Sequence, residues 1–132
     1  MSGFESQRAA IEAHFTTEWA SRTPISYEEV PYTPIAETSY VAIWINAGSA
    51  IQVSFPAGYR YTGIVQVDIN CPLNVGTKVI SEHADVVSPI FMGQQVSSGS
   101  QTISFRSLSV FKTSVGDWKR WSMTFEMWRD VC

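Results

Sequence analysis

The residues of this chain that could do chemistry are two histidines, two cysteines and one pair of adjacent glutamates. A protein zinc site needs three or four close ligands, and neither His14 nor His83 stands in a sequence cluster of that size. We therefore expect both histidines to lie at the margins of helices. The sequence predicts no metal site.

Cys71 could act as a nucleophile with His83 as its base. However, Cys71 continues the apolar face of a predicted strand, where a free cysteine is usually a small buried hydrophobe. Glu28 and Glu29 are adjacent, so they point apart instead of pairing as acid and base. The polar stretch 93–101 lacks the Gly-Lys-Ser/Thr ending of a phosphate-binding loop. We therefore predict no catalytic residue, no cofactor and no enzymatic activity.

Two aromatic side chains flank two basic ones in the segment Trp118-Lys-Arg-Trp121. Such a segment could stack on single-stranded nucleic acid. The chain has a net charge of −3, a pI of about 5.3 and no basic block, which argues against a nucleic-acid surface. Trp and Arg are enriched in the hot spots of protein interfaces, so we expect a protein contact here. Trp118 has the parity of the polar face and is the better interface residue, whereas Trp121 belongs to the core face.

Composition favours one domain, 1–132, that associates with itself or with a partner. The chain is 45% hydrophobic and 13% aromatic but only 16% charged, against roughly 25% charged residues in an average soluble domain. Large exposed apolar patches mark interfaces, so part of this surface should be covered by another subunit. Cys71 and Cys132 form no disulfide framework, which indicates a reducing, cytoplasmic environment. Neither a signal peptide nor a membrane span is predicted.

Two regular periodicities locate the main elements. Residues 59–71 alternate between apolar and polar, which predicts a long strand with one buried face and one face exposed to solvent. After the break at Pro72–Gly76, apolar residues recur at helical spacing, which predicts a helix near 76–92. A capping box formed by Ser2 and Glu5 opens an earlier helix, near 3–21.

The other elements follow from shorter patterns. We predict strands at 25–27, 39–45, 51–55, 103–112 (with a bulge near Ser107) and 121–127, turns at 46–49, 56–58 and 115–117, and a flexible loop at 93–101. This order predicts an α+β domain of two layers, a mostly antiparallel mixed sheet with both helices packed on one face. Its expected core consists of Ile11, Phe15, Val65, Val67, Ile69, Val87, Phe91, Met123 and Phe125.

Three segments, taken in order, resemble the small phage tail-terminator-like proteins, which include a bacteriophage domain family. They are 23–30 (TPISYEEV), 63–69 (GIVQVDI) with the helix at 84–91, and 116–118 (GDW) before the closing strand. The resemblance covers most of the chain. It implies a virion structural protein that forms a hexameric ring, stops growth of the tail tube and joins the tail to the head-completion proteins.

The resemblance also implies partners and a location. The partners would be further copies of the chain, the tail tube protein and a neck protein, with no membrane and with DNA only as cargo in the ring lumen. The protein would assemble in the host cytoplasm and end at the neck-proximal end of the tail. We expect the ring contacts at projecting turns and loops, specifically at Asn46, Gly48, Gln94, Gln95, Ser98, Trp118, Lys119 and Arg120.

Two other readings stay open at this point. One is a small α+β ligand-binding or hydrolytic domain, which would need a concave pocket with converging polar groups. The other is a non-viral homo-oligomeric adaptor. A measured mass near six subunits, or copurification with a tail tube protein, would separate the tail protein from both.

Overall fold

The computed structural model describes residues 4–28, 30, 32–34, 38–54, 58–73, 77–98 and 101–131. The elements are α1 (Phe4–Trp19), β1 (Ile25–Tyr27), β2 (Tyr40–Ser54), β3 (Gly58–Pro72), α2 (Thr77–Phe91), β4 (Gln95–Ser98), β5 (Gln101–Val115) and β6 (Trp118–Val131). The predicted helices are therefore confirmed to within two residues at each end.

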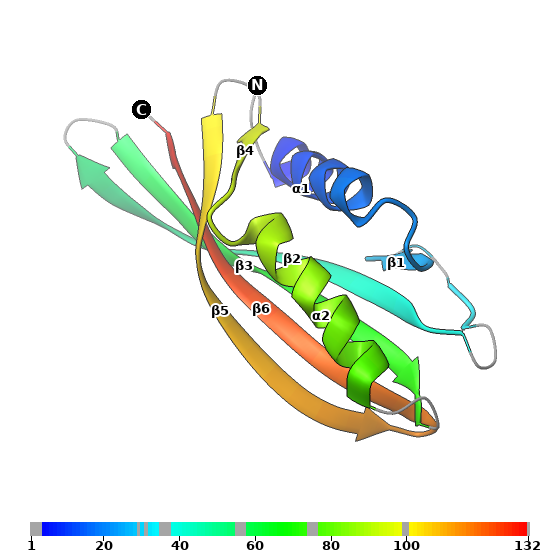
Figure 1. The fold of residues 1–132 in the computed structure, drawn as a ribbon. Helices are drawn as coiled ribbons and strands as arrows, with labels where there is room; N and C mark the ends of the chain where they lie inside the picture. Colours follow the sequence, from blue (N-terminus) through cyan, green and yellow to red (C-terminus); the bar gives the residue numbers. More distant parts are fainter. Residues whose placement is uncertain are drawn as a thin grey trace.

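One mixed sheet of six strands carries the fold, in the order β1-β2-β3-β6-β5-β4. The short strand β1 runs parallel to β2, and every other neighbouring pair is antiparallel. Both helices lie against the same side of this twisted sheet (Figure 1). The predicted α+β class, with two helices on one face of a mostly antiparallel mixed sheet, is confirmed.

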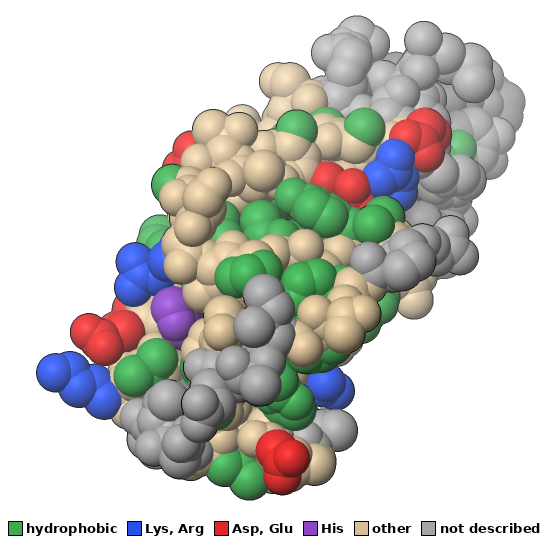
Figure 2. Space-filling view, turned by 90° about the vertical axis from the view of Figure 1, so that its right-hand side faces the viewer, with side chains coloured by type: hydrophobic (Ala, Val, Ile, Leu, Met, Phe, Trp, Pro, Cys, Tyr) green, Lys and Arg blue, Asp and Glu red, His purple; other side chains and the backbone are tan. Residues whose placement is uncertain are grey.

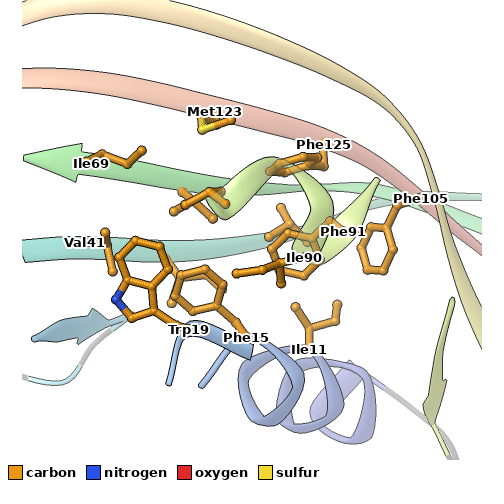
Figure 3. Packing of buried hydrophobic residues seen from close by; sticks show 14 of the residues in the cluster. Ile11, Phe15, Trp19, Val41, Ile69, Ile90, Phe91, Phe105, Met123 and Phe125 are labelled. Atoms are coloured by element: carbon orange, nitrogen blue, oxygen red, sulfur yellow. The ribbon is translucent and has the colours of Figure 1, made fainter. Parts of the chain in front are cut away.

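The core lies between the helices and the inner face of the sheet, which is the face toward α1 and α2. Phe91 of α2 is central, with its ring stacked on Phe15 of α1 at 5.9 Å between centroids. The same ring meets Phe125 at 5.1 Å and Phe105 at 4.9 Å, so it joins both helices to β5 and β6 (Figure 3). All nine residues predicted for the core are buried, namely Ile11, Phe15, Val65, Val67, Ile69, Val87, Phe91, Met123 and Phe125.

Both helices end where the backbone turns into the left-handed region. After α1, Ala20 and Ser21 have φ of 55° and 58°. After α2, Gly93 has φ of 76°, a conformation that glycine adopts without the strain of a Cβ atom. At the other end of α1, the predicted capping box involves Ser2, which lies outside the described residues.

The turn predicted at 46–49 is wrong. β2 continues through it, because Asn46 pairs with Ile64 and Ser49 pairs with Thr62 on the neighbouring strand. The register shifts between these two pairs, so the Asn-Ala-Gly-Ser sequence forms a bulge inside a strand of 15 residues. The strands predicted at 39–45 and 51–55 are therefore one strand, β2, whose last residue, Ser54, pairs with Gly58 of β3. Of the turn predicted at 56–58, residues 56 and 57 lie outside the described residues.

The flexible loop predicted at 93–101 is also wrong in part. Residues Gln95–Ser98 form β4, which pairs antiparallel with the start of β5. Val96 explains the ordering, because it is the buried side chain of this segment and belongs to the core cluster. The bulge predicted near Ser107 is confirmed by the register shift between Phe105 and Ser107. The turn predicted at 115–117 is confirmed as well, with β5 ending at Val115 and β6 beginning at Trp118.

Candidate assembly surfaces

One end of the sheet carries a row of aromatic side chains on its outer face, which is the face away from the helices. The Trp118 ring meets the Tyr40 ring edge-on at 5.3 Å, and Tyr40 in turn meets Tyr32 at 5.0 Å. All three side chains are half-buried. Trp118 therefore has a structural contact of its own at the predicted interface, and the remainder of its surface is available to a partner.

Arg120 holds a polar network on the same face. Its Nε atom donates to Asn70 Oδ1 at 2.7 Å and lies 4.0 Å from Asp68 Oδ2. Gln66 Nε2 donates to the other carboxylate oxygen of Asp68 at 3.0 Å. The Arg120 guanidinium is thus already bound within the subunit. Its main role is to hold the β5–β6 hairpin against β3, and it offers little free charge to a partner.

The prediction that one face of the long strand 59–71 is exposed to solvent is wrong for two of its residues. Asp68 and Asn70 are only 3% and 1% exposed although they point away from the helices. Asn70 lies between Tyr40 on β2 and Arg120 on β6, which are its direct partners in the register. Side chains of the neighbouring strands exclude water here, and period-two alternation within one strand could not reveal them.

Cys71 and His83 do not form a nucleophile and base pair. The Cys71 thiol is fully buried, and this burial raises its pKa, which disfavours the reactive thiolate. His83 Nδ1 instead accepts a hydrogen bond from Arg22 Nε at 3.1 Å, and the ring tilts against Trp19 at 5.8 Å. Burial, followed by the nearby Arg22 charge, lowers the pKa of His83.

His14 has a structural contact. Its Nε2 atom donates to the carbonyl of Ile90 at 2.7 Å, in the last turn of α2, where carbonyls lack partners within the helix. This bond ties α1 to the end of α2, as expected for a histidine at a helix margin. Among the described residues, no three His, Cys, Asp or Glu side chains are placed to hold a metal ion. Likewise, none of the helices in that part of the chain has the length and apolarity needed to cross a membrane.

A buried clamp that the sequence did not suggest joins the start of α1 to the end of β6. Arg129 Nε donates to Gln7 Oε1 at 2.5 Å, and the guanidinium lies 4.4 Å from the centre of the Tyr61 ring. Gln7 Nε2 also approaches the Met127 sulfur at 3.5 Å. Arg129 is 3% exposed, so this charge serves the fold and not the surface.

The remaining predicted interface residues lie far from Trp118, Lys119 and Arg120. Gln95 pairs with Ser104, which pairs with Trp128, ten residues along β6 from Trp118. At the rise of a strand, this corresponds to roughly 33 Å. Gln94 and Gln95 are exposed at that far end. For Gly48 and Ser98 the structure describes the backbone, within β2 and β4 respectively. The predicted residues therefore form separate patches instead of one site.

Asn46 belongs to a third region, a hollow on the outer face of β2 and β3. The hollow has a volume of about 390 Å³ and is lined by Glu28, Trp44, Ile45, Asn46, Ile64 and Gln66. Glu28 Oε1 accepts a hydrogen bond from the backbone N–H of Ile45 at 3.1 Å, which places this carboxylate at the rim. Neither this hollow nor the one lined by Glu18, Asp85, Val86, Pro89 and Ile90 brings a nucleophile and a base together.

The face of the molecule seen in Figure 2 is sparsely charged over broad areas. Figure 2 views the molecule from the right-hand side of Figure 1, where hydrophobic and uncharged side chains occupy the middle of the view. Acidic and basic side chains lie mainly at the left side and the bottom of the view, with others together at the upper right. Such a surface suits contacts with other protein subunits better than it suits a polyanion.

Comparisons with known proteins point in one direction. A family model described as phage tail terminator protein matches residues 7–127. Among the solved structures that share the fold, one has a TM-score of 0.78 at 18% identity, covering 98% of this chain and 96% of the other. Another belongs to the virion of a native gene transfer agent particle, with a TM-score of 0.64, 16% identity and 94% coverage of both chains. None of the curated proteins matches.

Proposed function

Because the chain belongs to the phage tail terminator family, which matches residues 7–127, we propose that it caps the phage tail tube and ends tube polymerisation. Membership makes the protein a structural component of the phage tail and of the virion. The family match carries the proposal. The likeness in fold to a chain from the virion of a gene transfer agent particle supports it, since that chain also belongs to a virion.

The proposed working form is a closed ring of six subunits. A cyclic ring needs two different patches on each subunit, because its contacts are heterologous. The chain offers distinct surfaces at well-separated places: the aromatic end around Trp118, the opposite end around Gln95, and the hollow beside Asn46. Their separation supports a ring in which neighbours meet edge to edge while the two ends of the sheet remain available to other proteins.

The proposed partners follow from this arrangement. One open side of the ring would bind the last layer of the tail tube protein, and the other would bind a head-completion or neck protein. DNA would pass through the lumen as cargo, without sequence recognition. The protein would assemble in the host cytoplasm and remain at the neck-proximal end of the tail.

A hydrolytic or ligand-binding role receives less support. The raised pKa of the buried Cys71 thiol and the bond between Arg22 and His83 leave that pair without an activated nucleophile. The low charge and the separated patches are compatible with an adaptor of other proteins. Membership of the tail terminator family favours a tail role over a non-viral one.

Coexpression with the tail tube protein of the same phage tests the proposal. We expect tubes of limited length that carry this chain at one end, as seen by electron microscopy, and a released species with the mass of six subunits. Tubes that grow equally long with and without the chain, and that do not retain it, would contradict the proposal.

A further inference from the structure

Phe111 is the most exposed large hydrophobic side chain among the described residues. It lies on β5 and is 70% exposed. Its partner in the register is Ser122 on β6, whose neighbour Met123 faces the core, so Phe111 projects from the outer face of the sheet. A phenyl ring held out in this way loses favourable burial unless another surface covers it.

The strand that carries Phe111 also has an open edge. β4 pairs with only the first four residues of β5, Gln101 to Ser104. From Arg106 to Val115, no strand in the described part of the chain pairs with the edge of β5 that points away from β6. Long open edges are usually blunted or covered, because their unpaired backbone groups recruit other chains.

The hollow beside Trp44 lies on the same outer face, near the opposite edge of the sheet. Trp44 is 39% exposed, and Ile64 adds an aliphatic wall. β1 pairs with β2 only from Val41 to Ile43, so the hollow lies next to the position where β2 loses its pairing partner on this edge. Of the side chains that line the hollow, Glu28 carries the charge, and it is already hydrogen-bonded to Ile45 at the rim.

The two features lie at nearly the same height along the strands. Trp44 pairs with Gln66, which pairs with Thr124, while Phe111 pairs with Ser122. The offset is two residues of β6, roughly 7 Å at the rise of a strand. From β2 to β5 the strands alternate in direction, so β5 of one copy would lie antiparallel to β2 of a copy placed beside it in the same orientation. Figure 1 shows these two strands toward opposite edges of the sheet.

We propose that Phe111 of one subunit inserts into the Trp44 hollow of the next subunit, so that this pair of surfaces is the repeating contact between copies of the chain. The occupant of the hollow is a second copy of the chain. Its Phe111 ring projects from the same outer face of the sheet as the hollow and lies at nearly the same position along the strands as Trp44. A contact between two different patches on opposite edges is heterologous, and it forms a ring when the rotation between neighbouring subunits closes on itself. This inference rests on the proposed ring and specifies its interface.

Cysteine cross-linking tests the contact directly. Two full-length variants, Ser109→Cys and Asn46→Cys, keep the Phe111 ring, because Ser109 is the exposed residue two positions before it on the same face. Both are made with Cys132→Ser, which leaves the buried Cys71 as the natural thiol. Mixed under mild oxidation, the two variants are expected to give one cross-linked heterodimer in preference to either homodimer. A chain that carries both substitutions should give a ladder beyond the dimer. Cross-linking that is equal among all combinations, or absent, would overturn the proposal.

A matched pair of variants tests the role of the ring. Phe111→Thr and Val110→Thr place the same residue at adjacent edge positions that face opposite sides of the sheet. We expect Phe111→Thr to weaken self-association about tenfold or more, as for a hot spot, while Val110→Thr changes it little. Equal effects would overturn the proposal. Tubes that are still capped by an unimpaired Phe111→Thr ring would remove this interface while leaving the proposed capping function intact.

Discussion

At the scale of single residues, the outer face of β3 shows how a polar side chain becomes structural. Asp68 and Asn70 are shielded by neighbouring strands, so their polar atoms need partners inside the protein. Arg120 supplies a charged donor to Asn70 and lies near Asp68. A surface arginine elsewhere on the same face, Arg106, makes only an exposed pair with Glu126.

Arg120→Met should therefore destabilise the protein more than Arg106→Met does. Removing Arg120 leaves a buried acceptor without its donor, at a cost of about 1–3 kcal/mol in the free energy of unfolding. Arg106 and Glu126 are both more than half exposed, so the loss of their pair should cost under about 1 kcal/mol. Urea denaturation of the two variants measures the difference, and equal midpoints would contradict the structural role of Arg120.

His83 should make stability depend on pH. Burial and Arg22 lower its pKa in the folded protein, so the unfolded chain binds the proton more readily. The contribution of neutral His83 is complete above the unfolded pKa of about 6.5 and is lost as the pH falls below that value. We expect the wild type to lose more stability than His83→Gln between pH 7 and pH 5. Parallel stability profiles for the two proteins would count against this interpretation.

At the scale of elements, the sheet combines long central strands with partly covered edges. β2, β3 and β5 each have 15 residues, whereas β1 has three and β4 has four. β1 pairs with only part of β2, and β4 pairs with only part of β5. β4 is held through Val96, which among the described side chains of this strand is the one in the core cluster, opposite Ile103 of β5. Such a short, singly anchored strand should open locally more easily than the central strands do.

Val96→Ser should release β4 without unfolding the protein. A buried valine contributes about 1.5 kcal/mol or more, so amide hydrogen exchange at Gln95 and Val96 should accelerate by about tenfold or more. Exchange in the centre of β3 should change much less. Ser97→Ala, at the exposed neighbouring position, serves as the control. Uniform acceleration across all strands would mean that β4 is part of the global folding unit instead.

At the scale of the whole molecule, the predicted assembly residues are distributed over the two ends of the sheet and over β2, near one of its edges. The Trp118 end and the Gln95 end are separated by most of the length of β6. In a ring built from edge contacts, these ends become the two open sides of the ring. In the proposed ring, Phe111 would lie between subunits and Trp118 would face a partner above or below the ring.

Trp118→Ala should impair tube capping more than it impairs folding. Its edge-on contact with Tyr40 contributes about 0.5–1.5 kcal/mol beyond burial, so the melting temperature should fall modestly. Trp121 packs against the core, and Trp121→Ala should lower the melting temperature much further. Thermal melts and a tube-length assay measure the two effects. A Trp118 variant that melts as low as the Trp121 variant, with normal capping, would make Trp118 a purely structural residue.

The sequence by itself determined the elements whose signal is local. Alternation along 59–71 predicted β3 and its core residues, and the helical spacing after Gly76 predicted α2, because side-chain direction repeats every two residues in a strand and every 3.6 in a helix. The same patterns predicted the class of fold. Resemblance in three short segments predicted the family that the comparison with family models then matched.

Only the tertiary structure decided which turn signals act as turns and which polar residues face water. The Asn46–Ser49 sequence has strong turn residues, yet β3 pairs with β2 on both sides of it and absorbs it as a bulge. The sequence of Gln95–Ser98 predicts a loop. In the structure Val96 belongs to the core cluster and β5 supplies partners for the backbone. The sequence predicts that Asp68 faces solvent, but Arg120 of the neighbouring strand β6 approaches its carboxylate. In each case the deciding groups belong to other parts of the sheet, and their proximity exists only once the strands have paired.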